Sequence, residues 1–223
     1  MTRNIFYGIR LTGKRLPVVL ILLVIIPLFA GCIKRSAPIS IERYAFEYPS
    51  PKFSGQDRIE HAIKVERFSA AKAFNSLSMV FRPEPYKLDT YASNRWMIKP
   101  GDMVSDYLVR DFRNSGLFKA VFSFRDMEDA RFILEGSVDE FLEIDDKEKR
   151  TATITLSVTV LDVSGAGLSN RLLFQKKYHA AEPLPEKSPT GLAQAMSTGM
   201  EKLSAMIIND IYLTVQAPPA DRR

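Results

Sequence analysis

The most regular pattern in the chain is an alternation of apolar and polar residues over positions 151–163. An apolar residue occupies every second position from Ala152 to Val160, and threonine or serine occupies the positions between them. This period of two predicts a long strand with one buried and one polar face. Shorter patterns of the same kind predict strands at residues 59–68, 77–82, 86–92, 118–124, 132–138 and 172–180. The charged turn at 145–150 and the glycine-containing turn at 165–167 favour an antiparallel meander.

Two other segments repeat their apolar residues every three to four positions, which is typical of amphipathic helices. The first begins at Pro100, carries Asp102 in its first turn and stops before Gly116. The second covers residues 189–213. Its apolar stripe comprises Leu192, Met196, Met200, Leu203, Ile207 and Ile211. Such a stripe needs a sheet to cover, so the predicted fold class is α+β, with a largely antiparallel β-sheet and two amphipathic helices packed on one face.

The first 31 residues have the composition of an export signal. Four basic residues and no acidic residue accompany an apolar stretch of 15 residues at positions 16–30. That stretch is shorter than the roughly 20 residues that a membrane-spanning helix needs, so it predicts a secretory signal. We therefore divide the chain into a signal peptide at 1–31, a lipidated N-terminus and tether at 32–57, a folded domain at 58–216 and a disordered tail at 217–223. Within the tether, residues 41–48 form an extended piece that can add a strand.

The end of the signal resembles a bacterial lipobox. The residues that carry the resemblance are Leu28, Phe29, Ala30, Gly31 and Cys32, with Phe29 in place of the more usual leucine. The resemblance implies that Cys32 becomes the first residue after cleavage, with diacylglycerol on its sulfur and a further acyl chain on its amine. Several acyl chains anchor a protein stably, whereas one does not. Ile33 stands where aspartate would favour inner-membrane retention, which points to the outer membrane. A plain signal anchor with an incidental cysteine is the alternative.

Charge and composition exclude several functional classes. The formal net charge is +5, but the residues after position 31 contain 27 basic and 26 acidic side chains, so no electrostatic argument for nucleic-acid binding remains. With Cys32 as the single cysteine, the chain forms no internal disulfide. Two histidines cannot make a three-histidine zinc site. We therefore expect no metal and no cofactor other than the covalent lipid.

No sequence motif indicates catalysis. The chain has no Walker A loop and no G-x-S-x-G nucleophile elbow. The acidic residues between 139 and 148 fit either a calcium loop or carboxylate pair, or a solvated hairpin end interleaved with basic residues. His61 and His179 have no recognisable partner motif. We expect that the protein is not an enzyme, with a lipid-anchored hydrolase as the minor alternative.

Three features can contribute to a partner or subunit interface, although each also has a purely structural explanation. The single tryptophan is either a core anchor or an interface contact. Aromatic residues among the prolines of residues 79–91 suit a contact loop. The threonine face of residues 151–159 is either the wet side of the sheet or a packing surface. The candidate interface residues are Trp96, Phe81, Tyr86, Thr153, Thr155 and Thr159.

The order of these features resembles the ABC-type transport auxiliary lipoprotein family, which includes the paraquat-inducible C-type outer-membrane lipoproteins. The resemblance rests on the lipobox, the strand near residues 63–66, the element from Asn94 through Trp96 and Pro100 into residues 107–112, and the closing residues 116–121. The meander and terminal helix also fit.

The resemblance implies a non-enzymatic component of a lipid-trafficking ABC system. The implied partners are an MCE-domain protein with its ABC permease and ATPase, and the implied location is the periplasmic face of the outer membrane. Some family members form rings, so a homo-oligomeric ring is also implied. A lipoprotein that activates a cell-wall synthase, or scaffolds a secretion or Tol-like assembly, is the alternative from a different functional class.

Overall fold

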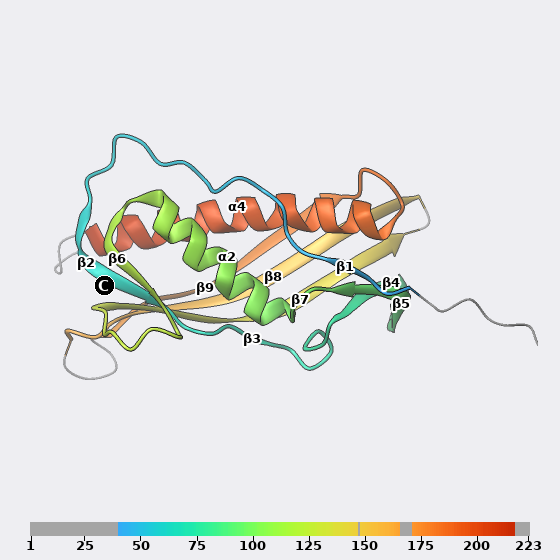
Figure 1. Cartoon of the computed structure of the whole chain (residues 1–223), viewed down its shortest axis with the longest axis horizontal. Helices are drawn as coiled ribbons and strands as arrows, with labels where there is room; N and C mark the ends of the chain where they lie inside the picture. The colour runs from blue at the N-terminus through green and yellow to red at the C-terminus, as the bar shows by residue number, and fades with distance from the viewer. Residues whose placement is uncertain (1–39, 147, 166–170, 217–223) are drawn as a thin grey trace, which may run out of the picture. The chain divides into compact units, whose positions relative to one another are not determined.

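A computed structural model describes residues 40–146, 148–165 and 171–216. The expected signal peptide, the lipobox with Cys32 and the expected tail at 217–223 lie outside these residues. The described elements form an α+β structure with one nine-stranded mixed sheet and two helices (Figure 1).

Three long strands form the antiparallel part of the sheet. They are β7 (Phe132–Asp146), β8 (Lys149–Asp162) and β9 (Leu172–Pro183). β7 pairs with β8 along its whole length, with one irregularity between Val138 and Glu140. The predicted meander is confirmed, because β7 pairs antiparallel with β8 and β8 pairs antiparallel with β9.

The shorter strands join this meander mainly in parallel. They are β1 (Glu42–Tyr44), β2 (Ile59–Val65), β3 (Ser69–Ala70), β4 (Ser78–Glu84), β5 (Lys87–Trp96) and β6 (Phe118–Ser123). β4 and β5 form an antiparallel hairpin, whereas β2, β3 and β4 all pair with β7 in parallel. β2 also pairs in parallel with β6, through a crossover that includes the first helix. The sheet is therefore antiparallel in its long ladders and mixed overall.

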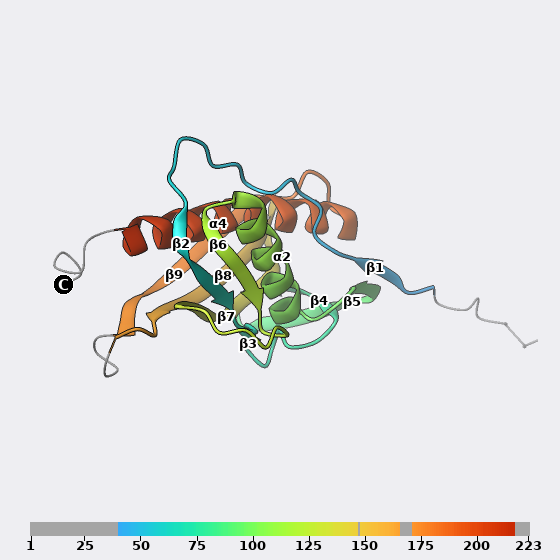
Figure 2. The same cartoon turned by 60° about the vertical axis from the view of Figure 1, so that its left-hand side comes forward.

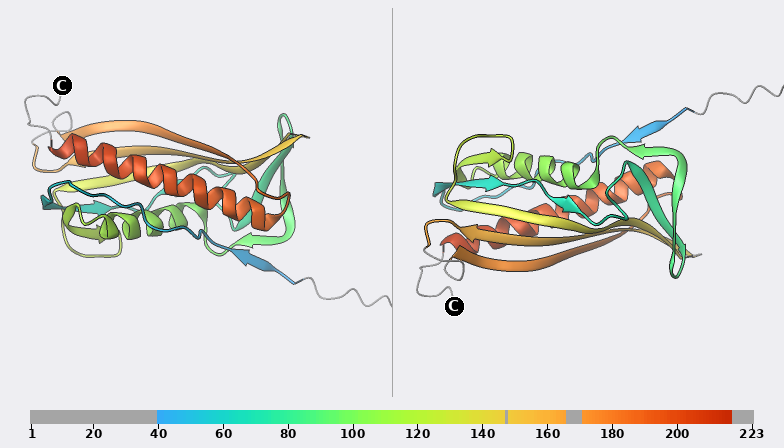
Figure 3. Two further views of the ribbon diagram at one scale, coloured as in Figure 1. Left: turned by 90° about the horizontal axis from the view of Figure 1, so that it is seen from above. Right: turned by 90° about the horizontal axis from the view of Figure 1, so that it is seen from below.

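Both helices lie on one face of the sheet, as expected (Figure 3). Helix α2 (Pro100–Ser115) begins at Pro100 and ends at Gly116, whose φ of 68° is the left-handed conformation that favours glycine. Helix α4 (Pro189–Gln216) packs on β8 and β9. The apolar positions of β8 from Ala152 to Val160 are all buried, so the predicted buried face is confirmed.

The segment before β2 is part of the folded domain, which corrects the expected tether at 32–57. β1 pairs with β5, and Phe46 is buried against Trp96, Tyr107 and Phe141. The proline-rich composition indicates a loop, but Phe46 and Tyr48 pack against Tyr107 of α2, and Phe46 also packs against the sheet. Figure 3 shows this segment running along α2 and α4. The domain therefore includes residues from Ser40 onward, and the expected extended piece at 41–48 contains the strand Glu42–Tyr44.

Candidate functional surfaces

The turn between β4 and β5 presents an exposed aromatic side chain in an unfavourable backbone conformation. Glu84 pairs with Lys87, so Pro85 and Tyr86 form a two-residue turn. Tyr86 has a φ of 66°, a conformation that favours glycine and costs a bulky residue roughly 1 kcal/mol. Its side chain is fully exposed. The ring therefore contributes no burial that would offset the backbone cost.

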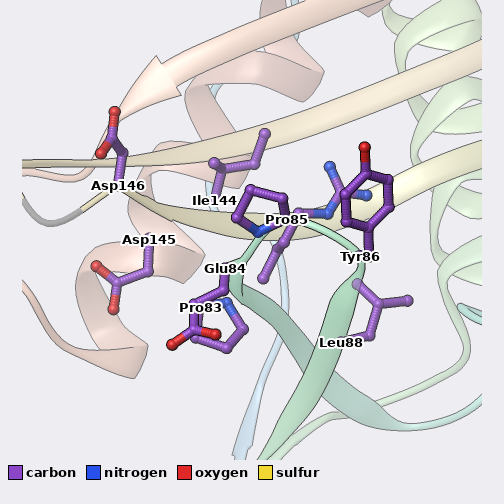
Figure 4. A pocket seen from close by; sticks show the side chains of 9 residues that line it. Pro83, Glu84, Pro85, Tyr86, Leu88, Ile144, Asp145 and Asp146 are labelled. Carbon is purple, nitrogen blue, oxygen red and sulfur yellow. The ribbon is translucent and has the colours of Figure 1, made fainter.

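A groove of about 1080 Å³ lies beside this turn. The pairing of Phe81 with Glu143 and of Arg82 with Ile144 places the hairpin next to the end of β7. The groove is lined by Arg82, Pro83, Glu84, Pro85, Tyr86, Leu88, Ile144, Asp145 and Asp146 (Figure 4). We call it the hairpin groove. Its walls combine apolar side chains with a largely acidic rim, a composition suited to contact with an apolar or amphipathic partner.

A buried polar cluster fixes the base of the hairpin. The Tyr91 hydroxyl donates a hydrogen bond of 2.7 Å to Glu143 Oε2. Arg150 Nη1 lies 3.3 Å from Glu143 Oε1, and its Nη2 lies 2.8 Å from Asp145 Oδ2. Burial raises the pKa of Glu143, while the Tyr91 hydrogen bond and the Arg150 charge oppose that effect. The cluster joins β5, β7 and β8, so the hairpin has a fixed base and a protruding tip.

A second buried cluster holds the N-terminal segment against both helices. Asp111 in α2 is fully buried and accepts hydrogen bonds from Tyr48 at 2.8 Å, Ser204 at 2.7 Å and Arg110 at 2.8 Å. Burial raises the pKa of the Tyr48 hydroxyl, and the Asp111 charge raises it further. The Arg110 guanidinium also lies 4.3 Å from the centre of the Tyr48 ring. We call residues 40–57 the strap, because these contacts tie them to α2 and α4.

The sheet face opposite the helices is polar, and several of its side chains bond one another. Thr155 donates a hydrogen bond of 2.7 Å to Glu140 and lies 2.9 Å from His179 Nδ1. Asp139 accepts hydrogen bonds from Ser137 and Ser157. Thr159 lines a shallow polar groove on this face and accepts a hydrogen bond from Gln175. These contacts give structural partners to His179 and to Asp139 and Glu140 of the acidic group at 139–148.

The structure separates the candidate interface residues into core and surface. Trp96 is 1% exposed and packs edge-on against Phe141, so it is a core anchor and the interface interpretation is wrong. Thr153 and Thr155 are 3% and 5% exposed, so they present no free surface to a partner. They are buried because β8 lies between two other long strands. Their polarity in the sequence suggested exposure.

Phe81, Tyr86 and Thr159 retain accessible surface, and Tyr86 has the most. Phe81 is half-buried against Tyr91, at a centroid distance of 5.3 Å. The sequence analysis did not identify Leu88, which is 45% exposed beside Tyr86. The strand predicted at residues 86–92 does not specify which of its side chains are exposed, and the structure supplies this.

Within residues 40–146, 148–165 and 171–216, no group of three or more histidine, cysteine, aspartate or glutamate side chains is placed to hold a metal ion. Across the same ranges, neither helix combines the length and apolar character required to cross a membrane.

His61 Nε2 lies 2.7 Å from Arg131 Nη1, which in turn belongs to an ion pair with Asp162.

Comparison with known proteins gives one family and several structural relatives. The family model for the ABC-type transport auxiliary lipoprotein component matches residues 44–208. The crystal structure of protein XCC0632 from Xanthomonas campestris is 22% identical, with a TM-score of 0.70 over 78% of this chain and 96% of that one. A further crystal structure, of an uncharacterized protein, is 13% identical, with a TM-score of 0.61 over 77% of this chain and 99% of that one. At these identities the likeness shows the fold alone.

A PelC dodecamer from Paraburkholderia phytofirmans is 13% identical over 76% of this chain and 94% of that one. Its TM-score of 0.33 supports no argument about the oligomeric state of this chain. No curated protein matches the sequence.

Proposed function

This chain belongs to the ABC-type transport auxiliary lipoprotein family, and on that premise we propose that it serves an MCE/ABC-type lipid transport system as a lipid-anchored auxiliary component. It faces the periplasm from the outer membrane and docks or receives the transporter there. The single observation that carries the proposal is the family match over residues 44–208. The proposed partners are an MCE-domain protein, its permease and its ATPase, and the chain itself assembles into a ring.

The proposed role is binding rather than catalysis. The buried titratable groups of the domain are engaged in pairs that join separate elements: Asp111 with Tyr48 and Ser204, and Glu143 with Tyr91. Such pairs support a rigid scaffold, whereas an active site needs a poised group that substrate can reach. The accessible features are surfaces, namely the hairpin groove and the polar sheet face.

The proposed anchor is acylated Cys32. The strap at residues 40–57 is bonded to both helices, through Tyr48 to Asp111 in α2 and through the Glu47 amide to Ser197 in α4. A firmly attached N-terminal segment supports the proposed role in docking.

A gene deletion tests the proposal in cells. Removing the gene together with its paralogues should sensitise the cells to detergents, and the wild-type gene should restore the barrier. Cys32→Ser should fail to restore it and should accumulate as unprocessed precursor, with immunoblotting as the control for expression. A normal barrier in the complete deletion would contradict the proposed function, and normal maturation of Cys32→Ser would contradict the lipid anchor.

A further inference from the structure

We propose that the tip of the β4–β5 hairpin contacts the bilayer in which the N-terminus is anchored, with Tyr86 and Leu88 in the headgroup region. The proposal rests on lipidation of Cys32 but not on the identity of any transport partner. It assigns an orientation to the domain, with the hairpin groove toward the membrane and the opposite end of the sheet away from it.

The tip of the hairpin has a composition that suits the membrane interface. Tyr86 is fully exposed, Leu88 is 45% exposed and Pro85 is exposed between the acidic rim residues. Tyrosine has an apolar ring and a polar hydroxyl, and this combination favours the boundary between water and hydrocarbon. Tyr86 also occupies a left-handed position that glycine would occupy without strain. Inside the domain, no burial of the ring offsets the backbone energy that Tyr86 costs. A contact outside the domain gives the residue a role.

The first strand of the strap is directed so that its N-terminal end faces the hairpin turn. β1 runs parallel to β5, with Glu42 opposite Asn94 and Tyr44 opposite Trp96. The direction from Tyr44 back to Glu42 is therefore the direction from Trp96 along β5 toward Lys87 and the turn. Ile41 is also exposed, at the start of this path. Figures 1 and 2 both show β1 beside the β4–β5 hairpin.

The chain between Cys32 and β1 is long enough for the anchor and the hairpin tip to meet one membrane surface. Cys32 lies ten positions before Glu42, so the acylated sulfur lies within about 35 Å of the start of β1. The seven positions from Asn94 to Lys87 span about 23 Å of β5, so the hairpin tip falls within that reach. Strand β7 begins at the opposite end of the sheet, and its 15 residues extend for about 50 Å. Met127, in the loop before β7, is 94% exposed at that distant end and offers a matched control.

The charges near the tip indicate how the contact is made. Glu84, Asp89, Asp145 and Asp146 outnumber Arg82 and Lys87, so attraction to anionic lipid does not drive the contact. The acyl chains hold the domain at the surface, and tethering gives even a small apolar tip a high effective concentration at the bilayer. The contact should therefore persist when salt is raised to about 1 M, where surface charges are screened within about 3 Å.

The test uses the full-length lipidated protein in vesicles of phosphatidylethanolamine and phosphatidylglycerol. Because acylation consumes the only native thiol, Tyr86→Cys provides one free thiol per chain for an environment-sensitive fluorophore, and Met127→Cys provides the control. Intact mass is measured first, and a protein without acyl chains on Cys32 overturns the proposal. Circular dichroism checks that both labelled variants are folded.

Nitroxide-bearing lipid should quench the probe at position 86 severalfold more than the probe at position 127, and aqueous iodide should show the reverse order. Raised salt should leave both orders unchanged. Equal quenching at the two positions, or free access of iodide to position 86, overturns the proposal. This result is independent of the transporter: a quenched tip in a protein that copurifies with no MCE component would refute the proposed function and leave the membrane contact standing.

Discussion

Removing one hydroxyl from the strap, by Tyr48→Phe, should loosen its attachment to the helices. The hydroxyl donates to Asp111 Oδ2 at 2.8 Å, inside a cluster where the carboxylate is fully buried. A hydrogen bond to a charged group contributes about 1.5–3 kcal/mol, and the phenylalanine ring keeps the contact with Arg110. The free energy of unfolding should therefore fall by about 2 kcal/mol. Tyr44→Phe is the control, because its hydroxyl bonds Glu42 at an exposed site and should cost at most about 0.5 kcal/mol.

Chemical denaturation measures the global loss, and hydrogen exchange locates it. The Glu47 amide donates to Ser197 Oγ in α4, so its exchange should accelerate in Tyr48→Phe and remain slow in Tyr44→Phe. Because burial and Asp111 raise the pKa of Tyr48, the wild-type protein should lose stability as pH rises above the ordinary tyrosine value, and Tyr48→Phe should lose less. Equal stability of Tyr48→Phe and wild type, with unchanged exchange at Glu47, would refute the strap as a latched element.

Three further changes test other parts of the structure. Burial would raise the pKa of Asp162, but hydrogen bonds from Arg131 and Ser164 outweigh it and lower the pKa to about 2. Asp162→Asn should therefore cost about 2 kcal/mol at neutral pH. In denaturation experiments, the difference in free energy of unfolding between wild type and Asp162→Asn should shrink as pH falls from about 4 to about 2. A difference that stays constant over this range would contradict the ion pair. The pKa of Glu143 is raised in the folded protein, so protonation of this side chain favours the folded state. This contribution to the free energy of unfolding is present below pH 4.5 and is lost as pH rises. Glu143→Gln should remove that decline, and an identical pH profile would refute the assignment. Tyr86→Gly should raise the free energy of unfolding by about 0.5–1 kcal/mol by relieving the turn, whereas a loss of stability would argue against strain there.

Local signals in the sequence predict much of this fold because they act over a few residues. Pro100 and Gly116 bracket α2, since one supplies a helix start and the other a left-handed end. The alternation from Ala152 to Val160 identifies the face of β8 that the helices cover. The parallel pairings of β2 and β4 with β7 had no such signal, because alternation predicts a strand without specifying its partner or direction.

Contacts between charged and aromatic residues that are far apart in the sequence could not be predicted from the sequence. Asp111 follows Arg110 on an amphipathic helix, where a solvated position is the ordinary expectation. Its burial depends on Tyr48 and Ser204, which lie 63 and 93 residues away. Among the candidate interface residues, Tyr86 is fully exposed and Trp96 is buried, although both are aromatic residues close to prolines. Only the packing of the hairpin against β7 distinguishes them.

The most direct test of the proposed function is to purify the tagged, lipidated protein from gently solubilised native membranes and identify the proteins that come with it. The account predicts an MCE-domain protein with its permease and ATPase, and predicts that their recovery falls sharply in Cys32→Ser. Recovery of a peptidoglycan synthase or a secretion component in their place would contradict the transport assignment and place this domain in a different envelope machine.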